Sequence, residues 1–494
     1  MSQTIQKPLR DSAAMRWTAL LLLALAMFCS YIFMDILSPI FKEVQDTRGW
    51  DGTAFGTMQG SEVFLNVFVF FLIFAGIILD KMGVRFTAVL SGGVMLVGAI
   101  IKWYAMTDGF IGSSLDTWFT ENLNYIPIFD ELGVSPFYAG MPSSAKLAAC
   151  GFMIFGCGCE MAGTTVSKAI AKWFKGKEMA MAMGIEMAIA RVGVFAIFSI
   201  SPFIANKLGS VAAPVGFCTV LLLIGLINFI IFTFMDSKFD KELVAAGIKS
   251  EDSSEDEFQV KDLKQILTSL NFWVVAILCV LYYSAIFPFQ RYGANMLQCN
   301  LNGLSAETAA NIFRWFPIGA AVLTPFLGRY LDTKGKGATM LIWGAVLLIV
   351  CHLVFAFALP ATGSRFLAYA TIVVLGVSFS LVPAALWPSV PKIIDEKVLG
   401  SAYCLIFWVQ NIGLCFVPLL IGSVLDSSNA NNPDVIAAKA AGAEFIPYNY
   451  TVPLIIFACF GIAALVIALY LKALDSKRHL GLEEPNIKPA SDER

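Results

Sequence analysis

Twelve apolar stretches of membrane-spanning length dominate this chain of 494 residues. A transmembrane helix needs about 20 mostly apolar residues, and a hydrophobic fraction of 58% can supply twelve such helices together with their loops. Charged residues make up only 14%, against about 25% in soluble domains. We therefore expect an all-α polytopic membrane protein, and a soluble enzyme is close to excluded. The predicted spans lie near residues 17–40, 59–79, 86–105, 147–169, 179–204, 211–235, 270–289, 307–330, 338–359, 366–390, 400–422 and 451–473.

The spans fall into two sets of six, separated by a strongly charged segment. Residues 236–268 include the acidic run Ser250–Phe258, which is typical of a solvated connector. We expect an N-terminal six-helix half over 1–235, a linker over 236–268, a C-terminal six-helix half over 269–474 and a tail over 475–494. Both termini are expected in the cytoplasm, because the inner segments then hold 23 of the 34 basic residues and the outer loops hold 6. The linker and the tail are then cytoplasmic as well.

A short motif recurs at the same place in each half. The second and eighth spans end in the same order of glycine, aspartate and glycine, at an offset of 252 residues: Gly76, Asp80, Gly83 and Arg85, then Gly328, Asp332 and Gly335. Two copies in register resemble the pattern of the major facilitator superfamily (MFS), which implies two parallel six-helix halves and alternating access. We expect Gly83 and Gly335 to permit tight turns, and Asp80 and Asp332 to cap or pair with a neighbouring helix in one conformation. This gating motif says nothing about the substrate.

Ionisable residues inside predicted spans require a structural or functional explanation, because inserting each at the bilayer centre costs roughly 2.5–3.5 kcal/mol of free energy. Glu160 in the fourth span and Arg191 in the fifth form the sharpest pair. Counted from the turn at 172–177, both reach roughly 18–21 Å into the membrane at about 1.5 Å per residue. They form either a structural ion pair or the receptors for the two charges of a zwitterion. The two roles are compatible if the solute splits the pair.

Three other charged residues are candidates for coupling or binding. Asp35 precedes a Ser-Pro step that weakens the first span, so it is a candidate for binding a coupling cation or proton. Glu62 in the second span is a second coupling candidate, with a structural role as the simpler interpretation. Arg314 is the one arginine deep in the C-terminal half and is a candidate receptor for an anionic group. By contrast, Lys102, Lys146 and Lys168 lie near span ends and are expected to snorkel to the interface.

Polar residues on the helices of the second half provide weaker candidates. Tyr282 and Gln410 are expected to line a cavity, with packing roles as the alternative. Aligning Ala190–Gly193 with Gln410–Gly413 places Asn411 at the position of Arg191 in the repeat, which favours an inward-facing polar residue. The long loops 106–145 and 426–450 carry no recognisable motif.

Several segments resemble one branch of the superfamily more closely than the rest. These segments are Phe28–Pro39, Gly158–Glu160, Lys172–Glu178, Met187–Gly193, Ala385–Val390, Leu399–Tyr403 and Val409–Leu414. Their order and spacing are similar to those of the MFSD1-like lysosomal dipeptide transporters. The resemblance implies passage of dipeptides by a uniport-like, alternating-access mechanism, with Glu160 and Arg191 contacting the dipeptide termini.

The chain departs from that branch in its loops and tails. The outer loops are longer and differently composed, which argues against the accessory glycoprotein partner of the branch. Neither tail has an acidic dileucine signal, so a cell-membrane location is preferred, with the lysosomal membrane as the expectation for a eukaryotic protein. We expect a functional monomer in the lipid bilayer that acts on a small-molecule substrate.

Two other functions are compatible with these residues. Arg191 and Arg314 together leave open an organic-anion or sugar-phosphate carrier, and a non-transporting membrane sensor is the alternative from another class. A net charge of −2 gives no basic surface for nucleic acid. No nucleophile–base pair or cluster of metal ligands stands out, so the sequence predicts no enzyme, metal or cofactor.

Overall fold

The computed structural model describes residues 12–50, 52–131, 133–245, 260–301, 304, 306–313, 315–441, 443 and 445–487. All regular structure in these ranges is helical. Ten of the described helices are long and apolar enough to cross a membrane. The chain divides into two compact units, which are described separately below.

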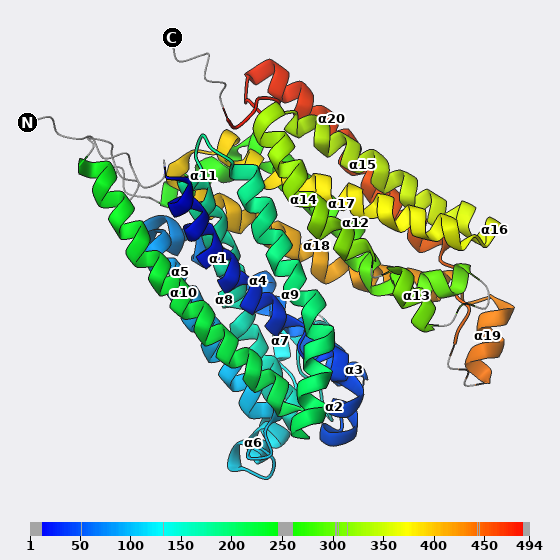
Figure 1. The fold of residues 1–494 in the computed structure, drawn as a ribbon. Coiled ribbons are helices and arrows are strands. Elements are labelled where there is room, and N and C mark those ends of the chain that lie inside the picture. Colours follow the sequence, from blue (N-terminus) through cyan, green and yellow to red (C-terminus); the bar gives the residue numbers. More distant parts are fainter. Residues whose placement is uncertain are drawn as a thin grey trace, which may run out of the picture. The chain divides into compact units, whose positions relative to one another are not determined.

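Unit 1 comprises Met1–Phe174, Ile189–Leu263 and Glu396–Trp408. In this unit α5 packs along α8 and α10, and α10 packs along α1 (Figure 1). Its long helices are α1 (Ala13–Met34), α5 (Phe71–Met106), α8 (Ser143–Trp173), α10 (Ala212–Ala245) and most of α9 (Met179–Leu208). Shorter elements are η2 (Ser38–Ile40), α2 (Phe41–Arg48), α3 (Gly52–Gly60), η3 (Ser61–Val63), α4 (Phe64–Phe68), α6 (Ser114–Asn122) and α7 (Pro127–Glu131).

Unit 2 comprises Lys175–Ala188, Lys264–Asp395 and Val409–Arg494. Here α17 packs along α14 and α15, and α20 packs along α12 and α15. Its long helices are α12 (Leu270–Asn300), α14 (Trp315–Lys334), α15 (Gly337–Leu353), α17 (Arg365–Ile393), α20 (Thr451–Arg478) and most of α18 (Leu399–Ser428). Shorter elements are α11 (Val260–Thr268), which begins in unit 1, α13 (Ala306–Phe313), the π-helix η5 (Val354–Ala358), α16 (Leu359–Thr362), η6 (Glu396–Val398), which belongs to unit 1, and α19 (Pro433–Ala440).

Two helices start in one unit and continue in the other. The first turns of α9, within Lys175–Ala188, belong to unit 2, whereas the start of α18, within Glu396–Trp408, belongs to unit 1. The units therefore follow the two sequence halves, except that each half contributes the beginning of one helix to the other unit.

The second predicted span, 59–79, is not one continuous helix. It runs from α3 through η3 and α4 to Phe70, whose φ of 58° is left-handed, and into the start of α5. A bulky residue in this conformation is strained, and the backbone groups freed by the break need partners. The Trp408 indole N–H supplies one of them by donating to the Val67 carbonyl at 3.3 Å. Beyond Gly83, α5 continues as the predicted third span.

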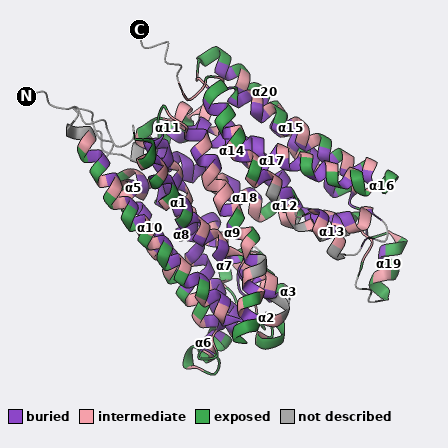
Figure 2. Ribbon diagram, viewed as in Figure 1, coloured by how far each residue is buried: buried purple, intermediate pink, exposed green. Residues whose placement is uncertain are grey.

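Helices α5 and α8 approach closely because glycines face each other between them. A Cβ on Gly98 would lie 2.5 Å from the Gly151 carbonyl oxygen, and one on Gly158 would lie 2.7 Å from Met95 N. Small residues let membrane helices pack where no hydrophobic force drives them together. Figure 2 shows the result for α8, whose residues are mostly buried, whereas α10 carries many exposed ones.

This packing yields a first prediction. Gly98→Ala should lower the melting temperature of the purified protein, since the added methyl group meets backbone atoms that cannot rotate away, and overpacking costs about 1–3 kcal/mol. Gly93→Ala, on the same helix with no atom within 4 Å of the new Cβ, is the matched control and should be neutral or slightly stabilising. Equal melting temperatures for the two variants would contradict the packing account.

Candidate functional site

The Asp80 carboxylate binds the start of another helix. Its oxygens accept the backbone N–H groups of Gly400 at 2.9 Å and Ser401 at 2.6 Å, in the first turn of α18. These N–H groups have no partner inside the helix, and the helix dipole makes this end attractive to an anion. The Lys168 ammonium also contacts Asp80 at 2.6 Å, and the Asp80 side chain is fully buried.

Asp332 makes the corresponding contact in unit 2. Its two oxygens accept the N–H groups of Ala180 at 2.9 Å and Met181 at 2.8 Å, in the first turn of α9. In place of a lysine, Asn486 donates its side-chain amide to Asp332 at 2.6 Å. The structure thus gives both aspartates of the repeated motif the same partner, the N-terminus of a helix.

The motif glycines allow these contacts. A Cβ on Gly76 would lie 2.8 Å from Ser401 Cα, and one on Gly328 would lie 2.7 Å from the Ala180 carbonyl carbon, so only glycine fits. Gly83 and Gly335 have φ angles of 78° and 72°, the left-handed conformation that glycine adopts most readily. Each loop therefore brings its aspartate against the helix start and then turns.

The surroundings of the two copies differ. Around the first copy, Arg85 pairs with Asp240 at 3.0 Å, and Lys172 pairs with Asp236 at 3.0 Å. Around the second copy, Lys392 instead donates to the carbonyls of Gly481 at 3.0 Å and Glu484 at 2.8 Å, in the segment after α20.

That segment, Gly481–Ile487, lies along the second loop. The Lys336 and Gly337 N–H groups donate to the carbonyls of Glu483 and Leu482, both at 3.0 Å, and the Glu483 carboxylate accepts the N–H of Thr339 at 2.7 Å. The described part of the C-terminal tail is thus a component of the second motif. A single sequence offers no pattern that reveals this contact.

Glu160 and Arg191 both lie in unit 1, half-buried, on α8 and α9. A Cβ on Gly163 would lie 3.9 Å from Met27 Cε, and one on Gly193 would lie 3.0 Å from the Phe28 ring, so α8 and α9 meet α1 at neighbouring residues. Glu160 is three residues from Gly163 and Arg191 two from Gly193. Measured along the axis of α1, the backbone positions of Glu160 and Arg191 therefore differ by at most roughly 5–10 Å.

Gly193 and Gly413, which follow Arg191 and Asn411 by two residues in the aligned segments, each pack against another helix of their own unit. Gly193 packs on α1, and a Cβ on Gly413 would lie 2.5 Å from Val280 of α12, the first long helix of the other half. Asn411 is 1% exposed, and neither its amide nitrogen nor its amide oxygen has a hydrogen-bond partner among the described residues. Unsatisfied buried amides are uncommon and need an explanation.

The remaining predicted residues have different surroundings. Tyr282 is fully buried and donates its hydroxyl to the Leu341 carbonyl, and the Gln410 amide oxygen accepts a contact from the Cys279 thiol at 3.4 Å. Both side chains are thus engaged within unit 2. Asp35 is half-buried at the C-terminal end of α1, and Arg314 lies outside the described residues.

The expectation that three lysines snorkel is wrong, because protein rather than the interface surrounds them. Lys168 binds Asp80, and Lys146 donates to the Phe119 carbonyl at 3.1 Å and to Asn124 at 2.9 Å. Lys102 is fully buried in α5, with its ammonium 3.6 Å from the centre of the Phe152 ring and no hydrogen-bond partner among the described residues.

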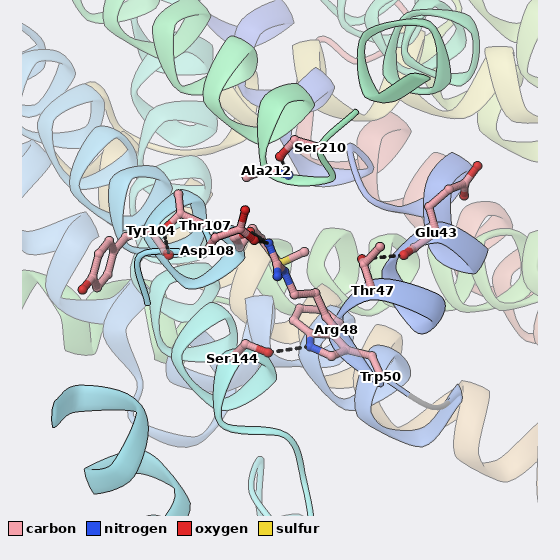
Figure 3. Close-up of polar contacts among 11 residues, drawn as sticks. Glu43, Thr47, Arg48, Trp50, Tyr104, Thr107, Asp108, Ser144, Ser210 and Ala212 are labelled. Atoms are coloured by element: carbon pink, nitrogen blue, oxygen red, sulfur yellow. Dashed lines mark hydrogen bonds and ion pairs between the residues drawn. The ribbon is translucent and has the colours of Figure 1, made fainter. Parts of the chain in front are cut away.

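Polar contacts also fix unit 1 at the C-terminal end of α5, where Figure 3 shows them. Arg48 donates to Asp108 at 2.6 Å and to the Met106 carbonyl at 2.7 Å, and Trp50 donates its indole N–H to Ser144 at 2.8 Å. These contacts tie the last residue of α2 and the nearby Trp50 to the ends of α5 and α8.

The comparisons with known proteins agree with this architecture. Residues 131–418, more than half of the chain, match the family model of the Major Facilitator Superfamily. The chain belongs to the major facilitator superfamily. It is a multi-pass membrane transporter, and proteins of this superfamily are not enzymes.

The similar curated proteins are lysosomal dipeptide transporters. The human lysosomal dipeptide transporter MFSD1 is 27% identical over 286 residues, which cover 56% of this chain and 59% of the human protein. The match therefore spans less than two thirds of that relative. The Danio rerio lysosomal dipeptide transporter MFSD1 is 26% identical over 343 residues, covering 66% of this chain and 72% of the fish protein.

Solved structures show the same fold at low sequence identity. The proton:xylose symporter XylE, bound to 6-bromo-6-deoxy-D-glucose, has a TM-score of 0.62 at 13% identity and covers 93% of this chain and 98% of its own. The transporter FucP in the outward conformation has a TM-score of 0.58 at 15% identity, with coverages of 92% and 98%.

The repeated caps predict a kinetic effect. Asp80→Asn or Asp332→Asn should slow transport in proteoliposomes several-fold while changing solute affinity less than twofold. An amide binds the α9 or α18 N-terminus less strongly than a carboxylate, and both aspartates lie beyond the predicted spans. Equal losses of affinity and rate would contradict a gating role.

A pH effect follows from the second aspartate, which lies beyond the predicted span 307–330. Burial raises the pKa of Asp332 to about 6, even though hydrogen bonds from Asn486, Met181 and Ala180 oppose the shift. Ionised Asp332 therefore lowers stability above pH 6, and this cost disappears as the pH falls toward 4. The melting temperature of the wild type minus that of Asp332→Asn should increase when the pH is lowered from 7.5 to 5. The exposed Asp395→Asn serves as control, and a pH-independent difference for Asp332→Asn would contradict the assignment.

Proposed function

We propose that this protein is an alternating-access carrier of dipeptides or closely related zwitterions that works as a uniporter. The observation that carries the proposal is an acid and a guanidinium, Glu160 and Arg191, at about the same level of α1 on two helices of unit 1. Similarity to the lysosomal dipeptide transporters supports it.

The chemistry of the pair matches a free dipeptide. Such a solute has an ammonium group at one end and a carboxylate at the other, so it supplies a partner for Glu160 and one for Arg191. A charge inside the bilayer region is costly unless it is paired. In the proposed cycle, the pair holds the N-terminal half together when empty, and the solute takes over both partners when bound.

Asn411 extends the proposal to the second half. Its buried amide offers both a donor and an acceptor that no described residue satisfies, and a peptide bond offers the complementary acceptor and donor. Gln410 and Tyr282 are the neighbouring candidates, and Asp35 and Glu62 remain coupling candidates. Arg314 would strengthen the competing proposal of an organic-anion or sugar-phosphate carrier. Such a carrier would not need the Glu160 carboxylate.

The membrane arrangement belongs to the same proposal. The distribution of lysine and arginine favours twelve spans with both termini, and both motif loops, in the cytoplasm. Breaking and remaking the Asp80 and Asp332 caps would then open and close the cytoplasmic side. The cell membrane is the proposed location, and the proposed functional form is a monomer.

The test compares Glu160→Gln, Arg191→Gln and the double variant by melting temperature and by binding of a labelled dipeptide. Each single change removes one charge of the proposed half-buried pair and leaves the other without that partner, a penalty of up to roughly 3–5 kcal/mol, so it cannot separate folding from binding. The double variant should regain most of the melting temperature and still lose binding by at least tenfold. Arg365→Gln, at an exposed position, is the control for loss of an arginine.

Capped dipeptides distinguish the two ends. N-acetylation should abolish the contribution of Glu160, and C-amidation that of Arg191, so a doubly capped dipeptide should not bind. A folded double variant that binds free and doubly capped dipeptides equally well would overturn the assignment. Stabilisation of the wild type by organic anions but not by dipeptides would favour the competing proposal.

A further inference from the structure

The segment Gly481–Ile487, which we call the strap, follows α20 and contacts the ends of α14, α15, α17 and α20 in unit 2. It begins after a turn in which His479 and Gly481 have left-handed φ angles of 52° and 75°. Leu482 is 1% exposed, whereas the neighbouring Glu484 is exposed. The strap is therefore packed into unit 2 and presents one side to solvent.

Side chains from three helices hold the strap. The Asp475 carboxylate of α20 accepts the N–H groups of Leu482 at 3.0 Å and Glu483 at 3.2 Å. The Lys392 ammonium of α17 donates to two strap carbonyls, at 3.0 and 2.8 Å. The Thr339 hydroxyl of α15 donates to the Glu483 carboxylate at 2.9 Å. These contacts keep the strap attached whatever residue stands at position 486.

Asn486 is the strap residue whose side chain reaches the Asp332 cap. Its amide nitrogen donates to Asp332 Oδ1 at 2.6 Å, and the same oxygen accepts the Ala180 N–H at 2.9 Å. The other oxygen, Oδ2, accepts the Met181 N–H at 2.8 Å. The Ile487 N–H also donates to the Asp332 backbone carbonyl at 3.0 Å. Asn486 thus fixes a carboxylate oxygen that binds the start of α9.

The first copy of the motif has a different partner at this place. Asp80 pairs with Lys168, which lies within the long helix α8. Asn486 instead lies in a segment outside the helices, held by hydrogen bonds and by the buried Leu482. A strap of this kind can open locally while the helices stay folded, whereas a residue inside a packed helix cannot leave alone. The second cap can therefore be regulated separately from the first.

We propose that Asn486 is a positioning residue for the Asp332 cap, and that attachment of the strap controls how firmly unit 2 holds the start of α9. A donated amide N–H satisfies part of the carboxylate and orients it toward the helix end. When the strap detaches, the buried carboxylate loses one donor, so it takes up a proton more readily and binds the α9 N–H groups less firmly. Detachment therefore slows the transport cycle without a change at the solute site.

This inference rests on the gating role that the proposed function gives to the Asp332 cap, and it adds the element that regulates that cap. The cap can be followed without a solute, through exchange of the N–H groups of Ala180 and Met181. Failure of the inference and failure of the proposed function are therefore distinguishable.

The first experiment measures hydrogen–deuterium exchange at pH 7.5 in a peptide that covers the capped N–H groups of α9. Asn486→Ala should speed exchange there at least threefold because the cap opens more often, and deletion of 481–487 at least tenfold. The Leu367 N–H, which a serine caps at the start of α17, is the internal control and should change less than twofold. The exposed Glu484→Gln is the strap control and should match the wild type. Unchanged exchange at the start of α9 in Asn486→Ala would overturn the proposal.

A matched substitution tests whether Asn486 acts through the Asp332 carboxylate. Asn486→Asp keeps the size of the side chain but places a second carboxyl group against Asp332, and two adjacent carboxylates cannot both stay ionised. The other charged groups that act on Asp332 among the described residues, Glu178 before α9 and Lys392 on α17, are unchanged in this variant.

The readout of this substitution is exchange at the start of α9, relative to the wild type at the same pH. Asn486→Asp should exchange at least tenfold faster at pH 8 and less than twofold faster at pH 5.5, where the two carboxyl groups share a proton. Asn486→Ala should exchange faster at both pH values. An equal excess at pH 8 and pH 5.5 for Asn486→Asp would contradict the positioning role.

Transport supplies an independent measurement. Uptake of labelled Ala-Ala into proteoliposomes should slow at least twofold in Asn486→Ala, with solute affinity changed less than twofold. In an Asp332→Ala background the same substitution should add nothing, because the carboxylate through which it acts is absent. Additive losses of rate would overturn the proposal. If the wild type transports no dipeptide while exchange at α9 still depends on Asn486, the proposed function fails and the role of the strap stands.

Discussion

A buried carboxylate needs hydrogen-bond donors, and in this protein the first turn of another helix supplies them. Asp80 takes the free N–H groups at the start of α18, and Asp332 takes those at the start of α9. The rest of the motif follows from these two contacts. The glycines that precede each aspartate allow the close approach, and the glycines that follow it make the turn. The same contacts explain why the beginnings of α9 and α18 group with the unit of the aspartate that caps them.

Charged side chains deeper in the helices also require compensating partners. Glu160 and Arg191 lie on helices that meet α1 at neighbouring residues, and Lys102 is enclosed by α1, α5 and α8. Because a charge in the bilayer region must be compensated, an exchange of partners is a natural way to couple solute binding to helix movement. In the proposed cycle, solute charges replace protein charges at the site, and the aspartate caps are made and broken at the helix ends.

Much of this architecture could be predicted from the sequence. The length of the apolar stretches predicts most of the long helices. The repeated glycine–aspartate–glycine pattern predicts both capping loops, because a turn is formed by residues at a fixed spacing along the chain. The alignment of Arg191 with Asn411 also has a counterpart in the packing of Gly193 and Gly413. Local patterns of this kind depend on residues that are close in sequence.

Features that depend on tertiary packing could not be predicted. The break at Phe70 follows a run of apolar residues with no Gly or Pro beside it, so no local signal marks it. The position of Lys102 near a span end predicts a snorkelling side chain, and only the approach of α8 through Gly151 shows why it is enclosed. The contact of Asn486 with Asp332 joins residues 154 positions apart.

A cryo-electron microscopy structure of the protein in lipid nanodiscs with a saturating free dipeptide would show directly whether Glu160 and Arg191 hold the solute. The proposed site predicts the dipeptide ammonium within hydrogen-bonding distance of the Glu160 carboxylate and the dipeptide carboxylate on the Arg191 guanidinium. A dipeptide bound elsewhere, with Glu160 and Arg191 still paired to each other, would contradict it.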